Sequence, residues 1–213
     1  IRLIKPSNAP TTNDHVWGFW SDPILADAQQ LARATWQKWA IITHDDCAVL
    51  SSETRPYNAF KRSDWSEHCK GLAELSKVTI VAEHEWERSV DSLLFDTRPP
   101  VVPNDCMLQH FQGIEVKTKQ ACFDKDMAIL MDFRVDQSKG MHFIYLLPYS
   151  TTEALVESTL FSTELVDDKF YSTSIESYLK QHCKVEEFSI THQEKGVIPL
   201  GKLSPHDAKI PCL

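Results

Sequence analysis

The chain has 213 residues, of which 42% are hydrophobic and 24% are charged, a composition typical of a globular protein with a substantial core. The net charge of −8 argues against a nucleic-acid-binding protein, because such proteins carry clustered basic residues. No apolar run approaches the length of a transmembrane helix.

The first predicted elements lie within the first fifty residues. The chain begins inside an apolar, strand-like run at residues 1–4 and not at a methionine, so we interpret it as an internal fragment of a longer protein. Residues 26–39 have a helix-forming composition, which predicts a short helix centred on Leu31. Residues 40–50 are apolar on both sides of Thr-His-Asp-Asp, which predicts two strands joined by a turn.

The next segment predicts a helix and two strands. Residues 63–76 favour a helix, and Ser63 is expected to cap its start. A strand is expected at 78–82. The run Leu93–Phe95 predicts a buried strand that ends in Asp-Thr-Arg, after which two prolines stop it.

A sheet is predicted next, and its first strand is expected at residues 107–116. Three apolar runs follow at 127–135, 141–147 and 154–161. Each run has the length of a strand and is bounded by a cluster of turn-forming residues, which predicts consecutive antiparallel strands.

The last of these strands carries the candidate for acid–base chemistry. Side chains alternate along a strand, so Leu155, Glu157, Thr159 and Phe161 share one face. Glu157 therefore lies between Leu155 and Thr159 on one face of its strand, and the neighbouring strands are apolar. The alternative is a solvent-facing carboxylate, which is common in antiparallel sheets open to water.

The C-terminal part predicts an amphipathic helix at 167–180 and a strand at 187–191. The apolar face of this helix carries Tyr171, Ile175, Tyr178 and Leu179.

The cysteines predict neither a disulfide framework nor a metal site. The six of them are scattered and form no Cys-x-x-Cys pair, so we expect reduced thiols and no bound metal. They are Cys47, Cys69, Cys106, Cys122, Cys183 and Cys212.

Several motifs together resemble one family, the flavin-dependent lycopene cyclases of bacteria. Leu155-Val-Glu-Ser-Thr159 is similar to the family's Phe-Leu-Glu-Glu-Thr motif, whose first glutamate falls on Glu157. Asn13–Trp20 is similar to Asn-Asp-Arg-Thr-Trp-Cys-Phe-Trp, and Asp96-Thr-Arg98 to a Phe-Asp-Ser-Arg-like motif. Met131-Asp-Phe-Arg-Val135 and the Gly-Val-Ile-Pro turn at 195–200 follow the family's order and spacing.

The resemblance implies a fold, a domain plan and a site. The fold would be α/β (α+β), a fragment of a glutathione-reductase-like FAD-binding fold with an antiparallel-sheet substrate domain. Residues 1–100 would form part of the FAD/NAD(P)-binding-like domain, 101–200 the substrate-binding sheet and 201–213 a tail. Glu157 would be the catalytic acid, and Asp96 and Arg98 would lie on the cofactor side, beyond a strand's carboxyl end. For these last two residues the alternative is a structural Asp–Arg turn.

The resemblance also implies an activity. The enzyme would be a lycopene β-cyclase-like intramolecular lyase or isomerase, which converts the ends of lycopene to β-rings without net redox change. It would use reduced FAD with NADPH as reductant, bind lycopene or a related polyene, and be cytoplasmic with peripheral membrane contact. The alternatives are another FAD-dependent lipid or isoprenoid oxidoreductase, either a monooxygenase or a reductase, and a non-catalytic lipid-binding relative.

Three positions depart from the family's pattern. Lys5 stands where an acid would bind the adenosine ribose, so the ribose is held otherwise or the site is weakened. His15 replaces an arginine, and Ser158 replaces the second acid of the catalytic motif. None of the six glycines forms a Gly-x-Gly-x-x-Gly loop, so we expect this fragment to bind flavin poorly and to be inactive alone.

Overall fold

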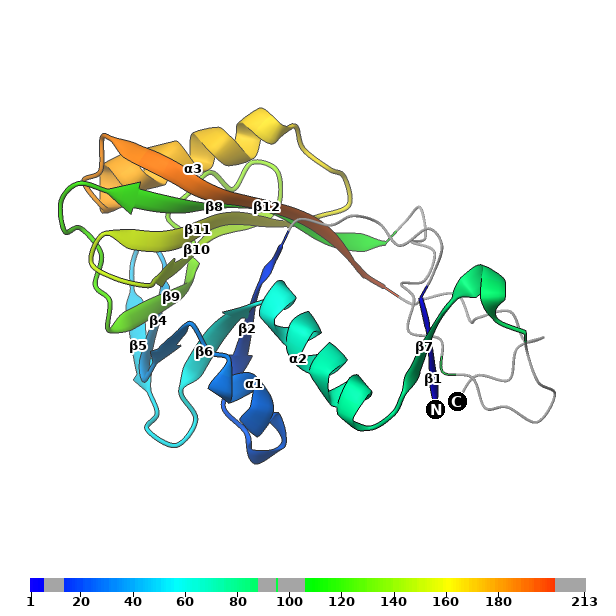
Figure 1. The fold of residues 1–213 in the computed structure, drawn as a ribbon. Helices are drawn as coiled ribbons and strands as arrows, with labels where there is room; N and C mark the ends of the chain where they lie inside the picture. The colour runs from blue at the N-terminus through cyan, green and yellow to red at the C-terminus, as the bar shows by residue number, and fades with distance from the viewer. Residues whose placement is uncertain (6–13, 88–94, 96–105, 202–213) are drawn as a thin grey trace.

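Three sheets and three α-helices make up the part of the chain that the computed structural model describes, which is residues 1–5, 14–87, 95 and 106–201. The largest sheet has seven strands, and all neighbours in it are antiparallel except β4 and β9, which run parallel (Figure 1). Its strand order is β12 (Phe188–Leu200), β8 (Met107–Thr118), β11 (Glu153–Ser162), β10 (Met141–Pro148), β9 (Met127–Asp132), β4 (Lys38–Ile42) and β5 (Cys47–Ser51).

The centre of this sheet confirms the predicted antiparallel strands. β10 pairs with β9 on one side and with β11 on the other, and β11 pairs with β8. Gly140, with a φ of +142°, ends the turn into β10, where a Cβ would also meet the Phe161 carbonyl oxygen at 2.4 Å. Two strands from the first hundred residues, β4 and β5, also belong to this sheet.

One face of the sheet packs against helix α3 (Asp168–His182). Its buried residues are the four predicted from the apolar pattern, and three of them, Ile175, Tyr178 and Leu179, join large-sheet side chains such as Ile144 and Val156 in one core. Asp167 caps the helix by accepting a hydrogen bond from the Phe170 backbone N–H at 2.9 Å. The predicted amphipathic helix is therefore confirmed.

The opposite face meets a smaller sheet of three strands, β2 (Val16–Trp20), β6 (Tyr57–Lys61) and β3 (Ala34–Trp36), in the order β2-β6-β3. A second core fills this interface, in which Trp36 and Ala59 from the small sheet contact Leu147 and Leu155 from the large one. Leu155 and Val156 thus belong to different cores, as the alternation of side chains along a strand requires.

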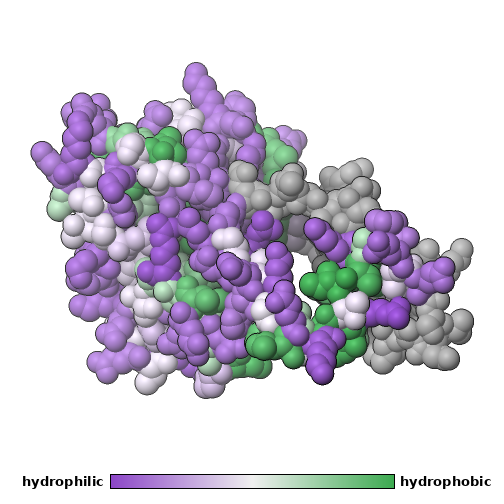
Figure 2. All heavy atoms as spheres, viewed as in Figure 1, coloured by the Kyte–Doolittle hydropathy of each residue, from purple (hydrophilic) through white to green (hydrophobic). Residues whose placement is uncertain are grey.

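A third sheet pairs β1 (Arg2–Lys5) in parallel with β7 (Thr79–Ala82), which confirms the strand expected at 78–82. It lies away from the seven-stranded sheet, beyond helix α2 (Arg62–Leu75) (Figure 1). Figure 2 shows a mostly hydrophilic face with a hydrophobic group over this pair, where Leu3 and Ile80 are exposed.

The short helix expected around Leu31 lies earlier in the chain and ends before that residue. α1 spans Ala26–Gln30, after a 3₁₀ turn at Pro23–Leu25, and Leu31 only caps its end. The residues that follow are rich in β-branched and aromatic side chains, and burial of Trp36 against the large sheet favours strand β3 over helix. The strands predicted at 40–50 are confirmed as β4 and β5.

The predicted cap of α2 is also wrong. The structural N-cap is Lys61, whose side chain makes no capping bond. Ser63 lies inside the first turn, where its backbone N–H and its hydroxyl both donate to the Asp14 carboxylate, at 2.8 and 2.7 Å. A residue far away in sequence thus satisfies the free donors at this helix start.

Two further expectations differ from the structure. Gly196–Leu200, expected as a turn, continues β12, which pairs with β8 as far as Leu200↔Met107. Phe95, expected at the end of a buried strand, lies outside any strand and is exposed. Leu93 and Leu94 lie outside the described residues.

Candidate functional site

The candidate site is a row of residues that crosses four adjacent strands of the large sheet. The strand register places Tyr145 of β10 opposite Glu157 of β11, Glu157 opposite Gly113 of β8, and Gly113 opposite Glu194 of β12. Residues directly opposite one another point to the same face. This face is the one that carries Leu155 and meets the small sheet.

Glu157 is partly buried and holds one hydrogen bond from its own strand. The Thr159 hydroxyl donates to Oε1 of Glu157 at 2.6 Å, which leaves the other carboxyl oxygen to carry a proton. Burial raises the pKa of Glu157 well above its ordinary value, and the neighbouring Glu194 carboxylate raises it further. A raised pKa favours the neutral form of the carboxyl, and in that form it is able to act as an acid.

Glu194 completes a carboxyl pair with Glu157. Its side chain is 2% exposed, and its Oε2 accepts a hydrogen bond from the Val16 backbone N–H of β2 at 2.8 Å. Burial raises the pKa of Glu194, whereas the Val16 N–H, the Glu157 carboxyl and the nearby His15 and His192 oppose that rise. The two carboxyl groups are within hydrogen-bonding reach of each other.

Gly113 makes room for this pair on the strand between them. A Cβ at this position would lie 3.0 Å from Cγ and 3.2 Å from Oε1 of Glu194, and 3.2 Å from a methyl group of Leu155. A side chain at this position would therefore force Glu194 or Leu155 to shift.

Two phenols border the carboxyl pair on its other side. The hydroxyl groups of Tyr57 and Tyr145 lie 2.6 Å apart, and burial raises the pKa of both, so both remain neutral. Gly18 lies directly over them, where a Cβ would approach the Tyr57 hydroxyl to 1.9 Å. The close approach of β2 to the site thus requires glycine at this position.

The next row along the same face holds an ion pair. Arg33 donates to Oε1 of Glu115 at 2.5 Å, and its guanidinium lies 3.8 Å from the centre of the Tyr149 ring. Glu115 is 5% exposed, so this pairing is needed to keep its charge inside the protein.

Aromatic residues of β2, which belongs to the segment that resembles a family motif, contribute to the interface. Trp20 packs edge-on against Trp39 and Tyr57, with ring centres 4.4 and 4.8 Å apart. Trp17 and Trp20 are each about 40% exposed, so they form a rim and not a closed core. His15 contacts Phe111 and the Lys195 carbonyl oxygen, which sets it close to Glu194.

Ser158 lies on the other side of the sheet from Glu157. It is fully buried and bonds to Nε2 of His142 at 2.8 Å, on the α3 side. Neighbours on a strand face opposite ways, so no residue at this position reaches the space in front of Glu157. His110 lies on this same side, where it bonds to the Tyr171 hydroxyl and to Ser162, and therefore belongs to the α3 core.

The cofactor-side residues expected from the sequence, Asp96 and Arg98, lie outside the described residues. Lys5 is exposed at the carboxyl end of β1. Within the described ranges no cluster of three or more His, Cys, Asp or Glu side chains is arranged to hold a metal ion, and no helix is long and apolar enough to span a membrane.

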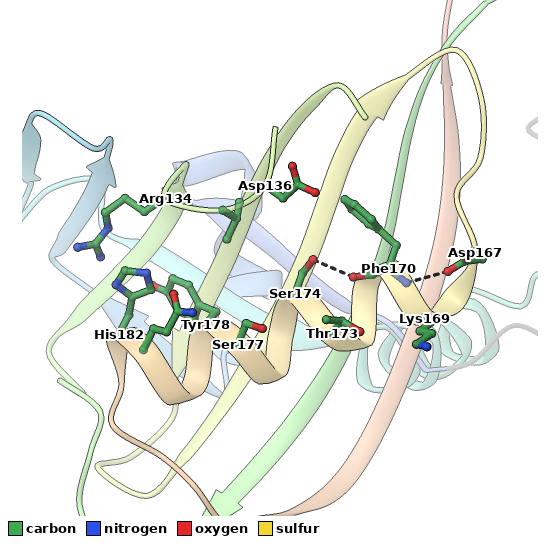
Figure 3. A pocket seen from close by; sticks show the side chains of 12 residues that line it. Arg134, Asp136, Asp167, Lys169, Phe170, Thr173, Ser174, Ser177, Tyr178 and His182 are labelled. Carbon is green, nitrogen blue, oxygen red and sulfur yellow. Dashed lines mark hydrogen bonds between the residues drawn. The ribbon is translucent and has the colours of Figure 1, made fainter. Parts of the chain in front are cut away.

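A cavity of about 480 Å³ lies between α3 and the loop after β9, on the face away from Glu157 (Figure 3). Two of its lining residues are already paired, because Arg134 and the Tyr178 hydroxyl both donate to the buried Asp132 carboxylate. These bonds outweigh the effect of burial and lower the pKa of Asp132.

Sequence reasoning did not identify Glu194, Gly113, Tyr145 or Tyr57 as parts of a site. Glu194 immediately precedes Lys195 and the Gly-Val-Ile-Pro motif, but a single carboxylate beside a motif gives no signal of pairing. Only the strand register brings it to Glu157.

The fold assigns the chain to a class. It is similar to a geranylgeranyl bacteriochlorophyll reductase-like protein from Thermoplasma acidophilum, with a TM-score of 0.61 and 12% identity over 92% of this chain and 58% of that one. It is also similar to a flavin-dependent brominase, with a TM-score of 0.55 and 9% identity over 91% of this chain and 60% of that one. The chain thus has the mixed α/β fold of these enzymes, as predicted.

The chain belongs to the lycopene cyclase family. The model of that family, described as lycopene cyclase protein, matches residues 1–211. A lycopene beta-cyclase from Paracoccus sp. is 33% identical over 102 residues, which are 47% of this chain and 25% of that protein. The matched segment thus spans a quarter of the relative's length, and the resemblance seen in the motifs is confirmed.

Proposed function

We propose that the protein containing this chain is a lycopene β-cyclase-like enzyme of carotenoid biosynthesis. It converts the ends of lycopene to β-rings in an acid-catalysed, redox-neutral isomerisation. Membership of the lycopene cyclase family supports the substrate class. The observation that carries the mechanism is Glu157, a carboxyl whose pKa is raised by burial and by a second carboxylate, on a face lined with aromatic side chains.

Glu157 performs both proton transfers in this proposal. As a neutral acid it donates a proton to the terminal double bond, and the resulting cation attacks an internal double bond to close the ring. The Glu157 carboxylate then removes a neighbouring proton, which restores the acid and leaves the atom and electron counts unchanged. Aromatic rings such as Tyr57 and Trp20 stabilise the positive charge and help to exclude water.

Reduced FAD, with NADPH as its reductant, belongs to the proposal for the whole protein on the strength of the family and the fold. Two features lead us to expect that this chain alone binds flavin poorly. Lys5 ends β1 where an acid would bind a ribose, and no Gly-x-Gly-x-x-Gly loop occurs in the sequence. The roles given to Glu157 and its neighbours therefore involve this chain's own groups alone.

The remaining parts of the proposal follow from the substrate. Lycopene is a long hydrocarbon that resides in lipid, so the protein would work from the cytoplasm in peripheral contact with a membrane. The exposed Trp17 and Trp20 are suited to such contact, because indole rings favour the membrane–water interface.

The test is to supply the full-length protein with lycopene and to measure product and oxygen together. We expect ring-containing product with no oxygen uptake and no net reductant consumed per ring. The similarity to a reductase-like protein and a brominase favours an oxidoreductase as the second candidate. Stoichiometric oxygen or reductant consumption would support that candidate, and lycopene binding without product would support a non-catalytic relative.

A further inference from the structure

The second carboxyl of the pair, Glu194, has no role in the mechanism so far. It is among the most buried charged residues of the described chain, at 2% exposed, and it comes from β12, two strands away from Glu157. A buried carboxylate is costly unless it is paired or hydrogen-bonded, so a position this close to the candidate acid calls for an explanation.

Three features build a place for Glu194. Val16 of β2 donates its backbone N–H to Oε2 at 2.8 Å, which fixes the carboxylate from above. The register sets Glu194 across Gly113 from Glu157, and the missing side chain at Gly113 leaves the space that the two carboxyl groups share. The side chains of Glu157 and Glu194 therefore approach each other over Gly113, which has no side chain to separate them.

We propose that Glu194 is a positioning residue that keeps the catalytic proton on Glu157. This inference rests on the proposed function. Two carboxyl groups this close do not both ionise readily, so the pair retains one proton where a lone surface glutamate would lose it. The Val16 N–H bonds to Glu194, which places the negative charge there and the proton on Glu157.

The same arrangement serves the return step. Once Glu157 has delivered its proton, its new carboxylate lies beside the Glu194 charge, which makes it a stronger base. It then removes the proton from the cyclised cation, and the original state of the pair is restored. Glu194 thus acts through Glu157 and need not touch the substrate.

Other charged and titratable groups face the Glu157–Glu194 pair, and the variants used in the experiment below leave all of them in place. On the surrounding elements they are Tyr145 and Tyr149 of β10 and its end, Tyr57 of β6, Glu115 of β8 with Arg33, His192 of β12 and His15 before β2.

The experiment measures the pH dependence of ring formation by the full-length protein and its Glu194→Gln variant. Glutamine keeps the shape but removes the charge, so we expect the alkaline limb of the profile to move to lower pH by about one unit or more. Activity at acidic pH should be retained, because Glu157 is still protonated there. Glu194→Asp should give a smaller shift, and the exposed Glu153→Gln on β11 should give none.

A second readout does not depend on activity. The infrared carbonyl band of protonated carboxyl groups, titrated in wild type and variants, reports Glu157 directly when compared with Glu157→Gln. Gly113→Ala, whose Cβ would crowd Glu194, should lower the titration midpoint of Glu157 as Glu194→Gln does. An unchanged midpoint in both folded variants would overturn the inference. If wild type forms no rings, the proposed function fails, and the infrared titration still decides whether the pair is coupled.

Discussion

At the scale of single residues, the site depends on which side chains share a face. Glu157 and Ser158 are neighbours in sequence, yet the first faces the aromatic interface and the second bonds to His142 beneath α3. The absence of a second acid at Ser158 therefore removes no carboxyl group from the face that carries Glu157. The second carboxyl comes instead from Glu194, which faces the same side as Glu157.

The raised pKa of Glu157 makes a prediction about stability. A carboxyl whose folded pKa exceeds its unfolded value of about 4.3 destabilises the folded state increasingly as pH rises above that value, until the folded pKa is passed. Glu157→Gln should therefore raise the melting temperature at pH 8 but not at pH 4. We expect about 2–4 °C for each unit of difference between the two pKa values.

Differential scanning calorimetry of the full-length protein at both pH values measures this effect. Glu153→Gln is the matched control, because Glu153 lies on the same strand but is exposed and paired with Lys117. A melting temperature of Glu157→Gln that falls at pH 8 would show that the carboxyl is not held in a desolvated state.

At the scale of elements, the sequence predicted best where local pattern and tertiary packing agree. The strands β9, β10 and β11 and helix α3 carry uninterrupted periodic patterns bounded by turn residues or a cap, and all were predicted. The short helix predicted around Leu31 ends before that residue, because burial of Trp36 against another sheet favours a strand directly after it. The pairing of Glu157 with Glu194 depends on a register between distant strands, which no local pattern specifies.

The start of α2 provides an element-scale prediction. Asp14 accepts hydrogen bonds from the backbone and the hydroxyl of Ser63, and these bonds outweigh burial and lower its pKa. Asp14→Ala should lower the free energy of unfolding by about 1 kcal/mol, as expected for the loss of a helix cap. Urea denaturation measures the change, with the exposed helix residue Glu67→Gln as a control. Equal stabilities for the two variants would contradict this role.

At the scale of the whole molecule, the sequence lacks the Gly-rich loop that binds a dinucleotide phosphate at a helix N-terminus. Lys5 and the lack of a Gly-rich loop predict that residues 1–213 alone bind FAD weakly, with little retained after gel filtration. Isothermal titration calorimetry with FAD measures this affinity directly, and circular dichroism checks that the fragment is folded. Tight, stoichiometric FAD binding by the fragment would show that other residues hold the cofactor.

The central claim is that Glu157 is the essential acid, and one measurement tests it most directly. Cells that make lycopene should carry the full-length protein or one of three variants, Glu157→Gln, Glu157→Asp and Glu153→Gln, at equal protein level and flavin content. Glutamine keeps shape and hydrogen bonding but delivers no proton, so ring formation should fall by roughly 10²–10⁴-fold. Aspartate should retain a little activity, and Glu153→Gln should match wild type. Normal ring formation by Glu157→Gln would contradict the account.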